Sequence, residues 1–389
     1  MNIIGEKVRL ARQIRNKTIT QLSEEVGVSK QAISQFENGV VEPKAETFFK
    51  LVQVLRFPIQ FYIKEIINSV QIRQTFFRAQ SSASALERKS YEERSSFVAG
   101  IYDCLEEYLN LPKLNLPKLS ILNDEISVME MENIAQSIRS YWNLGDKPIL
   151  NLVSLLEENG IIVSTLKDEE KKIDGFTQVY ECNGSVRYCV MLEDEKGSMA
   201  RRNFSAAHEL GHILLHSSLN NEDLNSTENR QIERQANLFA SCFLLPEKTF
   251  KKELINPNDY EGYLFLKKKW HVSIKAMFIR AKDLGLLSYD EYIILMKKYS
   301  YRIARSNKAG ERLEPLDDLI EVEYPELFQT ALTYLFENTD VDLDKFHEIL
   351  SQKGLAADEK FLTSILSIEE DFFDKYHTNK KILNISVRN

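Results

Sequence analysis

The chain has 389 residues, a hydrophobic content of 43%, a charged content of 28% and a formal net charge of −8. This length predicts two or three globular domains, and the acidic balance excludes a protein that coats nucleic acid along its whole surface. No apolar run approaches a membrane span, and the N-terminus lacks a signal-peptide pattern, so we expect a cytoplasmic protein that does not bind membranes. The four cysteines show no Cys-x-x-Cys spacing, which argues against a zinc ribbon or a disulfide framework.

Charge is distributed unevenly along the chain. Residues 1–68 carry ten Lys and Arg against seven Glu, a balance of +3, so the remainder carries −11. A mildly basic head on an acidic body favours one local DNA contact over an extended binding surface.

The pattern of apolar residues, glycines and prolines predicts a mainly helical chain with a small β-sheet, an α+β fold. Short helices fill residues 3–64, and further helices are expected over 130–143, 148–159, 200–216, 230–244, 261–298 and 325–378. We divide the chain into an N-terminal helical domain (1–68), a helical linker (69–125), a domain that contains the predicted strands (126–250), a helical segment (251–300) and an acidic helical C-terminal region (301–389).

The segment TQLSEEVGVSKQAISQFENG, residues 20–39, has the layout of a helix-turn-helix. Gly27 makes the turn, and Ser29 is a good N-cap for the second helix. Apolar residues of both helices face inward: Leu22, Val26, Ala32, Ile33 and Phe36.

The polar residues of the same segment are suited to duplex DNA. Gln pairs bidentately with adenine in the major groove, Lys suits guanine or phosphate, and a helix N-terminus binds phosphate. The predicted DNA-contacting residues are Gln21, Ser29, Lys30, Gln31, Ser34 and Gln35. The alternative is a small helical bundle whose polar face is only solvated or contacts another protein. Residues 3–64 resemble the XRE/Cro–phage-repressor family, which implies an operator in double-stranded DNA and a homodimer.

Three strand-like runs, 161–166, 173–180 and 186–193, follow the predicted helix at 148–159. The Asn183-Gly184 turn between the last two predicts a hairpin. Such a hairpin offers an edge along which a substrate strand can pair.

The segment FSAAHELGHILLH, residues 204–216, contains an HExxH motif on a predicted helix. His208 and His212 are four residues apart, so both imidazoles reach one metal ion, while Glu209 lies between them where it can touch a metal-bound water. Bound Zn²⁺ would lower the pKa of that water, and Glu209 would accept its proton and pass it to the leaving amine. HExxH also occurs by chance or in structural roles, so the motif alone does not decide.

The best candidate for a third ligand is Glu233, which shares a helix face with the small residues Ala236 and Ala240. Asn237, one turn further, is placed to hold a ligand through a hydrogen bond. The alternative for Glu233 is a solvated surface carboxylate. His216 repeats the i, i+4 spacing but lies about 12 Å from His208 along a straight helix, so it cannot share the same ion. We interpret His216 as a helix-end histidine that stands outside the site and interacts with the C-terminal helix dipole. The less favoured alternative is that it supports a metal ligand from behind.

The segments AHELGHILLH at 207–216 and ERQANLFASCFLLP at 233–246 resemble the ImmA/IrrE family of metallopeptidases. The resemblance implies that His208, His212 and Glu233 bind zinc and that Glu209 is the general base. It also includes an N-terminal XRE domain and a segment behind the peptidase similar to a helix-turn-helix. The segment 271–285 fits the latter, but any pair of packed helices shows the same pattern, and Lys267, Lys268 and Lys269 read as a solvated face.

These features predict a cytoplasmic transcription regulator that joins an XRE/Cro-type helix-turn-helix domain (1–68) to a zincin-like zinc metalloendopeptidase domain (126–250). The family likeness suggests that its substrate is a repressor or antitoxin-like protein. The alternative is a transcription factor whose zincin domain is a non-proteolytic sensor or structural module. A third option is self-cleavage within the polar segment 80–96, which would release the DNA-binding head.

Overall fold

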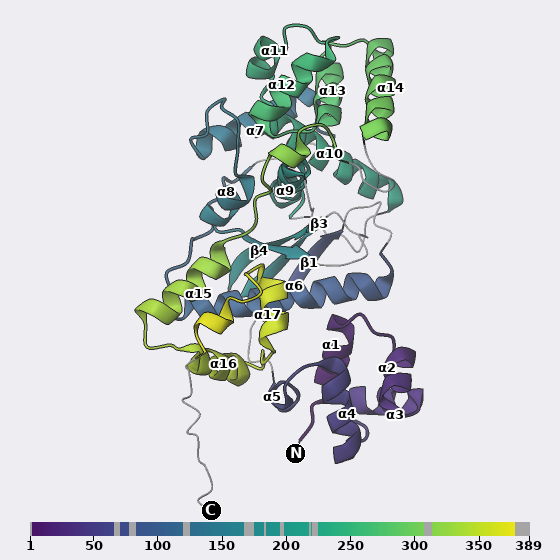
Figure 1. Ribbon diagram of the computed structural model, residues 1–389, viewed down its shortest axis with the longest axis vertical. Helices are drawn as coiled ribbons and strands as arrows, with labels where there is room; N and C mark the ends of the chain where they lie inside the picture. Colours follow the sequence, from purple (N-terminus) through teal and green to yellow (C-terminus); the bar gives the residue numbers. More distant parts are fainter. Residues whose placement is uncertain are drawn as a thin grey trace, which may run out of the picture. The chain divides into compact units, whose positions relative to one another are not determined.

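The computed structural model describes residues 2–65, 71–77, 83–119, 125–166, 175–182, 184–194, 198–217, 219, 225–306 and 313–377. The described residues form two compact units (Figure 1). The first unit draws on residues 1–68, 100–110 and 328–389, and the second on 69–99 and 111–327. Helices dominate both units, and one four-stranded mixed sheet lies in the second, which confirms the α+β fold class. Along the described ranges, no helix has both the length and the apolar character that crossing a bilayer requires.

The head of the first unit is a bundle of five short helices. They are α1 (Gly5–Ile14), α2 (Ile19–Val26), α3 (Lys30–Glu37), α4 (Ala45–Leu55) and α5 (Ile59–Ile63). A capping box between Thr18 and Gln21 starts α2, and Gly27 ends it in the left-handed conformation with φ 77°. Ser29 starts α3 by accepting a hydrogen bond from the Ala32 amide at 3.1 Å. These caps make the turn between α2 and α3 that the sequence predicts.

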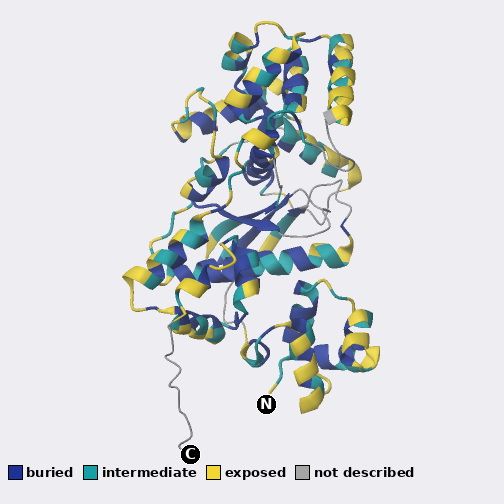
Figure 2. Cartoon of the chain, in the orientation of Figure 1, coloured by how far each residue is buried: buried dark blue, intermediate teal, exposed yellow. Residues whose placement is uncertain are grey.

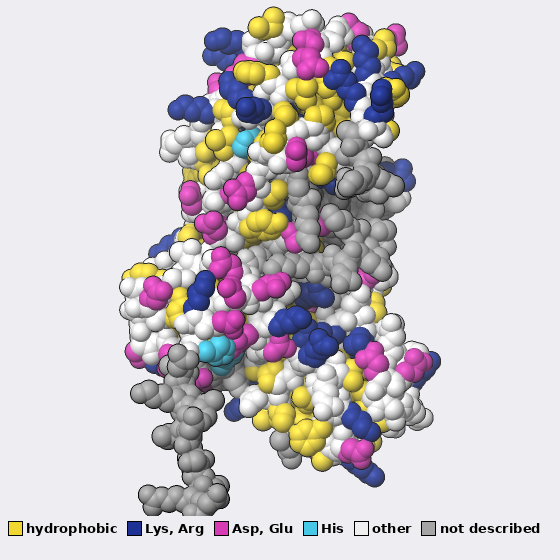
Figure 3. All heavy atoms as spheres, viewed as in Figure 1, with side chains coloured by type: hydrophobic (Ala, Val, Ile, Leu, Met, Phe, Trp, Pro, Cys, Tyr) yellow, Lys and Arg dark blue, Asp and Glu magenta, His cyan; other side chains and the backbone are white. Residues whose placement is uncertain are grey.

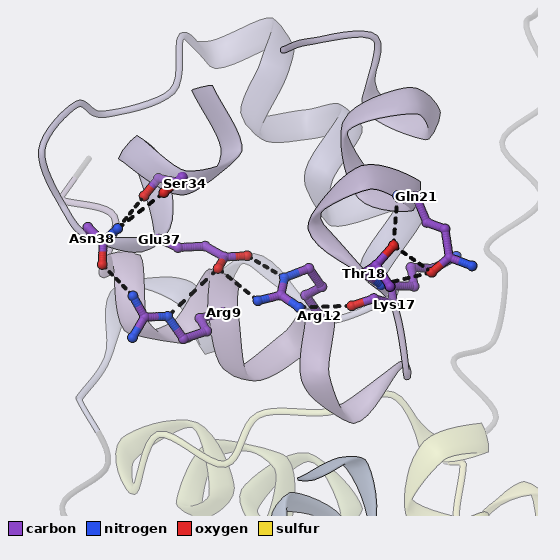
Figure 4. Close-up of polar contacts among 8 residues, drawn as sticks. All are labelled: Arg9, Arg12, Lys17, Thr18, Gln21, Ser34, Glu37 and Asn38. Carbon is purple, nitrogen blue, oxygen red and sulfur yellow. Dashed lines mark hydrogen bonds and ion pairs between the residues drawn. The ribbon is translucent and has the colours of Figure 1, made fainter. Parts of the chain in front are cut away.

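Apolar packing and one buried ion pair hold the head together. Leu22, Val26 and Ile33 are buried, as their spacing predicts. Arg12 of α1 donates to both carboxylate oxygens of Glu37 at the end of α3, at 2.5 and 2.9 Å (Figure 4). This charge-assisted fork fixes the angle between α1 and α3.

The first unit also contains helices from the end of the chain. They are α15 (Leu327–Asn338), α16 (Leu343–Gln352), α17 (Glu359–Leu366) and the 3-10 turn η3 (Phe373–Lys375). The Lys7 ammonium donates to the Gly354 carbonyl at 2.5 Å, and the rings of Phe57 and Phe361 meet edge to face at 5.2 Å. The acidic C-terminal region therefore packs on the helix-turn-helix head within this unit.

The sheet of the second unit has the strand order β1-β3-β4-β2. Its strands are β1 (Gln71–Phe77), β2 (Ile162–Leu166), β3 (Gly175–Cys182) and β4 (Ser185–Glu193). β3 and β4 pair antiparallel from Gly175–Leu192 to Cys182–Ser185, which confirms the predicted hairpin. β2 pairs parallel to β4, and β1 pairs antiparallel to β3.

Helices cover both faces of the sheet (Figure 1). α6 (Ala85–Glu106) lies on one face, where Tyr91 meets Phe176, and α9 (Met199–His216) lies on the other, where Glu209 meets Thr177. The remaining helices of this unit are α7 (Val128–Tyr141), α8 (Leu152–Glu158), α10 (Ser226–Leu244), α11 (Glu247–Glu253), α12 (Tyr260–Trp270), α13 (Ile274–Asp283) and α14 (Tyr289–Ser306). Because successive strand residues point to opposite faces, β3 is buried on both sides (Figure 2).

One prediction about the linker is wrong. Residues 71–77 fall in the stretch expected to be a helical linker, yet they form β1. The run QIRQTFF lacks the strict alternation of a half-buried strand, and its register shifts between Ile72 and Gln74. Only its pairing with β3 makes this segment a strand, and that partner lies about a hundred residues away in sequence.

Candidate functional site

Three potential metal ligands meet between α9 and α10. His208 and His212 lie one turn apart on α9, and Glu233 faces them from α10; their ligand atoms all lie within 4.8 Å of one another. The two histidine Nε2 atoms are 3.0 Å apart. The carboxylate of Glu233 lies 3.4 Å from His208 Nε2 and 3.3 Å from His212 Nε2.

This arrangement fits a tetrahedral zinc ion. Zinc bonds to nitrogen and carboxylate oxygen are about 2.0–2.2 Å long, so two ligands of a tetrahedral site lie about 3.3 Å apart. Two imidazoles and one carboxylate are also a donor set that zinc accepts, with a fourth position left for water or substrate. The residues present therefore fit the metal that the HExxH pattern implies.

Close packing of the two helices brings Glu233 to the histidines. A Cβ built on Gly211 of α9 would stand 3.2 Å from Ala236 Cα and 3.2 Å from the Phe239 ring of α10. Ala236 and Ala240 are fully buried in the same contact. The glycine and the two alanines let the helix axes approach, which explains a glycine inside a helix that it intrinsically destabilises.

The Glu233 side chain is 14% exposed, unlike a solvated surface carboxylate. Burial alone would raise the pKa of Glu233, but its contacts with His208 and His212 outweigh burial and hold the pKa well below its usual range. The group is thus an anion in the pocket formed by the two imidazoles.

Hydrogen bonds behind the histidines orient their rings. Asn237 Oδ1 lies 3.1 Å from His208 Nδ1, as the sequence predicts. His212 Nδ1 lies 3.2 Å from His216 Nδ1, and His216 Nε2 lies 2.9 Å from Gln235 Oε1. Because the Gln235 oxygen only accepts, His216 donates to it through Nε2 and accepts from His212 through Nδ1. His208 and His212 are thus both held through Nδ1, and both turn Nε2 toward Glu233.

The interpretation of His216 as a histidine outside the site is wrong. It is 2% exposed, and burial, helped by the neighbouring His212, lowers its pKa to about 3. A neutral ring is what an acceptor for His212 requires. The i, i+4 spacing of His212 and His216 was the available signal, and it brings the two rings into contact without a shared ion.

Glu209 sits beside the cluster and is held by the sheet. Thr177 of β3 donates its hydroxyl proton to Glu209 Oε2 at 2.6 Å, and Glu209 is 3% exposed. Thr177 could not be selected from the sequence, because a strand pattern does not indicate which helix residue a strand side chain faces. The hydrogen bond fixes one carboxylate oxygen of Glu209, the residue that follows His208 on α9.

The predicted free edge of the hairpin is absent from the described strands. β4 pairs with β2, and β3 pairs with β1, so both outer edges of the hairpin are occupied. Phe76 of β1 stacks on the His212 ring, with centroids 5.2 Å apart and planes 20° apart. A hairpin pattern in the sequence does not reveal that β2 pairs with β4 or that β1 pairs with β3, because both pairings join segments that are distant in the chain.

Most of the segment considered for self-cleavage is regular helix. Residues 85–96 belong to α6, and Ser90 and Ser95 are buried in it. Peptidases of the zincin type bind extended segments, which a packed helix does not supply. Residues 80–82 of the same segment lie outside the described residues.

The predicted DNA-contacting residues lie on α2, at the N-cap of α3 and along α3. Gln21, Ser29, Lys30 and Gln31 are exposed, while Ser34 and Gln35 are half-buried. Gln21 Oε1 accepts from the Thr18 amide at 2.8 Å, and Ser29 caps α3, so both carry a local role as well (Figure 4). Asn38 donates to the Ser34 carbonyl at 2.8 Å, which steadies the end of α3.

The second helix-turn-helix candidate has the turn geometry of the first. His271 takes the left-handed conformation that Gly27 takes, and Ser273 caps α13 through the Ala276 amide at 3.1 Å. However, Ile274 and Phe278 are fully buried, so α13 packs into the domain at the positions where α3 has Lys30 and Ser34.

The lysines and arginines near α13 lie in two other places, one buried and one on the surface of α14. Lys267 is fully buried and pairs with Glu314 at 2.9 Å and Asp317 at 2.6 Å, so its interpretation as part of a solvated face is wrong. Figure 3 shows Lys and Arg side chains gathered over α14, where Lys298 and Arg302 help line a pocket of about 490 Å³.

Comparisons with known proteins agree with both halves of this description. Residues 8–62 match the family model of the helix-turn-helix domain, and residues 156–282 match that of the IrrE N-terminal-like domain of the M78 peptidases. The chain is 32% identical to the HTH-type transcriptional repressor RghR of Bacillus subtilis over 97 residues, which cover 23% of this chain and 72% of that protein.

A Picrophilus torridus protein named as an HTH-type transcriptional regulatory protein is 24% identical over 151 residues. That match covers 34% of this chain and 48% of the other, so the chain spans about half the length of that relative.

Proposed function

This chain belongs to the HTH-type transcription regulators and fuses their DNA-binding domain to an IrrE N-terminal-like domain, and we propose that the second domain is a zinc endopeptidase. Its substrate is a regulatory protein of the repressor or antitoxin kind. One observation carries the proposal: His208, His212 and Glu233 converge within 4.8 Å, with Glu209 beside them. A purely structural module has no need of a carboxylate held next to three potential ligands.

In the proposed mechanism, His208, His212 and Glu233 hold the metal. Bound zinc would supply Lewis-acid activation of a water molecule and of the scissile carbonyl. Glu209 accepts a proton at the carboxylate oxygen and returns it to the leaving amine. Thr177 keeps that carboxylate in place, and Asn237 and His216 keep the imidazoles turned toward the site.

In the proposed DNA complex, α3 enters the major groove and Lys30, Gln31, Ser34 and Gln35 contact base edges or phosphates. Ser29 and Gln21 at the helix N-termini contact phosphates. Family likeness supports a homodimer on a palindromic operator, acting in the cytoplasm.

Replacing Glu209 tests the catalytic part of the proposal. Each protein is produced together with regulators encoded beside its gene, and the survival of each intact regulator is measured along with the zinc content. Glu209→Gln is expected to keep zinc and DNA binding but to lose cleavage by at least about a hundredfold, the lower range for a general base. Glu158→Gln, an exposed carboxylate on α8, is the control and should cleave like the natural protein.

Cleavage that survives Glu209→Gln would contradict the assigned base. If zinc is bound and no neighbouring regulator is cleaved by any variant, the domain is a non-proteolytic sensor or structural module instead.

A further inference from the structure

The strand β1 occupies the edge of the sheet that borders the metal-binding cluster. Its residues pair antiparallel with β3 from Gln71 opposite Glu181 to Phe77 opposite Phe176. β1 lies outside the region that matches the IrrE N-terminal-like domain, because that match begins at residue 156. The segment that completes this edge therefore comes from the stretch between the DNA-binding head and the matched domain.

β3 is the strand that holds the proposed base. Thr177 donates to Glu209, and a Cβ built on Gly175 would stand 3.5 Å from Glu209 Oε1. The residue of β1 directly opposite Thr177 is Phe76. Since opposite residues in a sheet point to the same face, Phe76 points toward α9, as Thr177 does.

The Phe76 ring covers the metal-binding cluster from this side. It stacks on His212 at 5.2 Å, lies 6.5 Å from the His216 ring, and is only 3% exposed. A side chain entering the site along this face of β3 meets Phe76 first.

The first residues of β1 are exposed at the start of the strand. Ile72 is 41% exposed, and the register shift between Ile72 and Gln74 interrupts the ladder. Arg73 pairs with Glu181, but exposed ion pairs contribute little. Among the β1 side chains whose burial the structure describes, residues 71–76, Phe76 is the buried one.

Protein segments commonly bind by adding a strand to a sheet edge, where backbone hydrogen bonds give affinity and one or two side chains give selectivity. β1 makes this kind of contact from within the chain. We propose that β1 is an internal occupant of the substrate-binding edge and that a protein substrate is cleaved only after β1 leaves β3. The substrate segment that replaces it is extended, pairs antiparallel with β3, and presents a large apolar or aromatic side chain where Phe76 lies. This inference rests on the proposed peptidase function.

The first test compares Phe76→Ala with Ile72→Ala, a matched change at an exposed position of the same strand. Zinc-loaded proteins are mixed with excess chromogenic chelator, and zinc transfer is followed with hydrogen exchange of the β3 amides. Phe76→Ala is expected to speed zinc transfer and β3 exchange about tenfold, because a buried aromatic contact is lost, while Ile72→Ala matches the natural protein. Equal rates in all three proteins would overturn the proposal.

The second test locks β1 in place. Gln71 and Glu181 are direct partners, so cysteines there lie within the range that a disulfide spans, and Gln71→Cys/Glu181→Cys leaves the core unchanged. The oxidised protein should keep its zinc but lose cleavage of the partner regulator, and reduction should restore it. Equal cleavage by the oxidised and reduced forms would overturn the proposal even if the variant is fully folded.

The two readouts separate this inference from the proposed function. If no form cleaves any regulator although zinc is bound, the peptidase proposal fails, and the zinc-transfer comparison still decides whether β1 covers the site. If the reduced protein cleaves and the oxidised one does not, both proposals stand.

Discussion

A relay of three side chains, Gln235, His216 and His212, runs from α10 through the end of α9 to the candidate metal centre. Each contact assigns a proton to the next: Gln235 accepts from His216, and His216 accepts from His212. A histidine ligand held by a fixed acceptor is a better metal donor than one free to rotate, because its tautomer and ring orientation are set in advance.

We therefore expect His216→Leu to weaken zinc binding about 10–100-fold, the usual effect of removing such a partner. His216→Gln should bind zinc within a few-fold of the natural protein, because its side-chain oxygen can accept from His212. Competition with a zinc chelator measures both affinities, and circular dichroism checks the fold. Equal weakening by the two substitutions would contradict the relay and indicate a packing role alone.

Gly211 makes a second residue-scale prediction. Ala is intrinsically the better helix former, but a Cβ at this position meets Ala236 Cα and the Phe239 ring at 3.2 Å, and backbone cannot move aside as a flexible side chain does. Gly211→Ala is expected to destabilise the fold by about 1–3 kcal/mol and to weaken zinc binding as α10 moves away. Urea unfolding and chelator competition measure the two effects.

Gly262→Ala on α12 is the matched control. The nearest atom to its added Cβ, Asp259 Oδ2, is 4.0 Å away, so helix propensity alone should act and stabilise the protein by up to about 1 kcal/mol. Stabilisation by both substitutions would show that α9 and α10 tolerate a wider spacing than the structure has.

At the scale of elements, the orientation of α3 is held by its N-cap, Ser29, and by the buried ion pair between Glu37 and Arg12. Ser29 fixes its first turn, and Glu37 at its last turn binds Arg12 of α1 in a buried fork. The exposed side of the helix is then free to carry Lys30 and Gln31 in a fixed orientation.

Binding to an operator selected from random duplexes tests this face. Gln31→Ala is expected to lose about 1–3 kcal/mol of discrimination at one base position, since Gln can pair bidentately with adenine. Lys30→Ala should weaken binding to all sequences and reduce the salt slope by about one. Fluorescence anisotropy across a salt series measures both, with Lys268→Ala on α12 as the control. Unchanged DNA affinity in all three variants would exclude α3 as the reading helix.

At the scale of the whole molecule, the DNA-binding head and the candidate metal centre belong to different compact units. Within the second unit, hydrogen bonds join the segment before α15 to both the first and the last turn of α8. Glu323 accepts from the Val153 and Ser154 amides at 2.9 and 2.8 Å, and Glu157 accepts from the Glu326 and Leu327 amides at 3.1 and 3.2 Å.

Burial of the Glu157 carboxyl group predicts a pH-dependent stability for the second unit. Burial raises the pKa of Glu157 to about 8 from the ordinary 4.5 of an unfolded chain. The folded state therefore binds a proton that the unfolded state releases, so this contribution is fully present below the unfolded pKa and is lost as the pH rises toward 8. From pH 7 upward we expect the free energy of unfolding to fall by up to about 1.4 kcal/mol per pH unit from this group, and about half as steeply at pH 8, where the folded group is half protonated.

Urea unfolding at several pH values measures this dependence, with Glu157→Gln as the comparison. The pH range begins above the ordinary histidine value, so that the lowered pKa of His216 adds little. Glu157→Gln should flatten the slope, and an unchanged slope would assign it to another group.

The sequence by itself determined the elements and motifs that depend on local spacing. Helical periodicity and caps located α2, α3, α9 and α10, and the HExxH spacing put His208 and His212 on one side of α9. The small residues near Glu233 also indicated a close helix contact, because side-chain volume limits how near two helices can approach.

Only the tertiary structure decided what spans distant parts of the chain. β1 is a strand because β3 accepts it, Thr177 meets Glu209 across the layer between sheet and helix, and His216 joins the site because α10 brings Gln235 to it. The position of Phe76 on His212 depends on the register of β1 against β3, and a one-residue slip would turn it to the other face. Such choices depend on pairing energies between segments far apart in sequence, which local propensity does not carry.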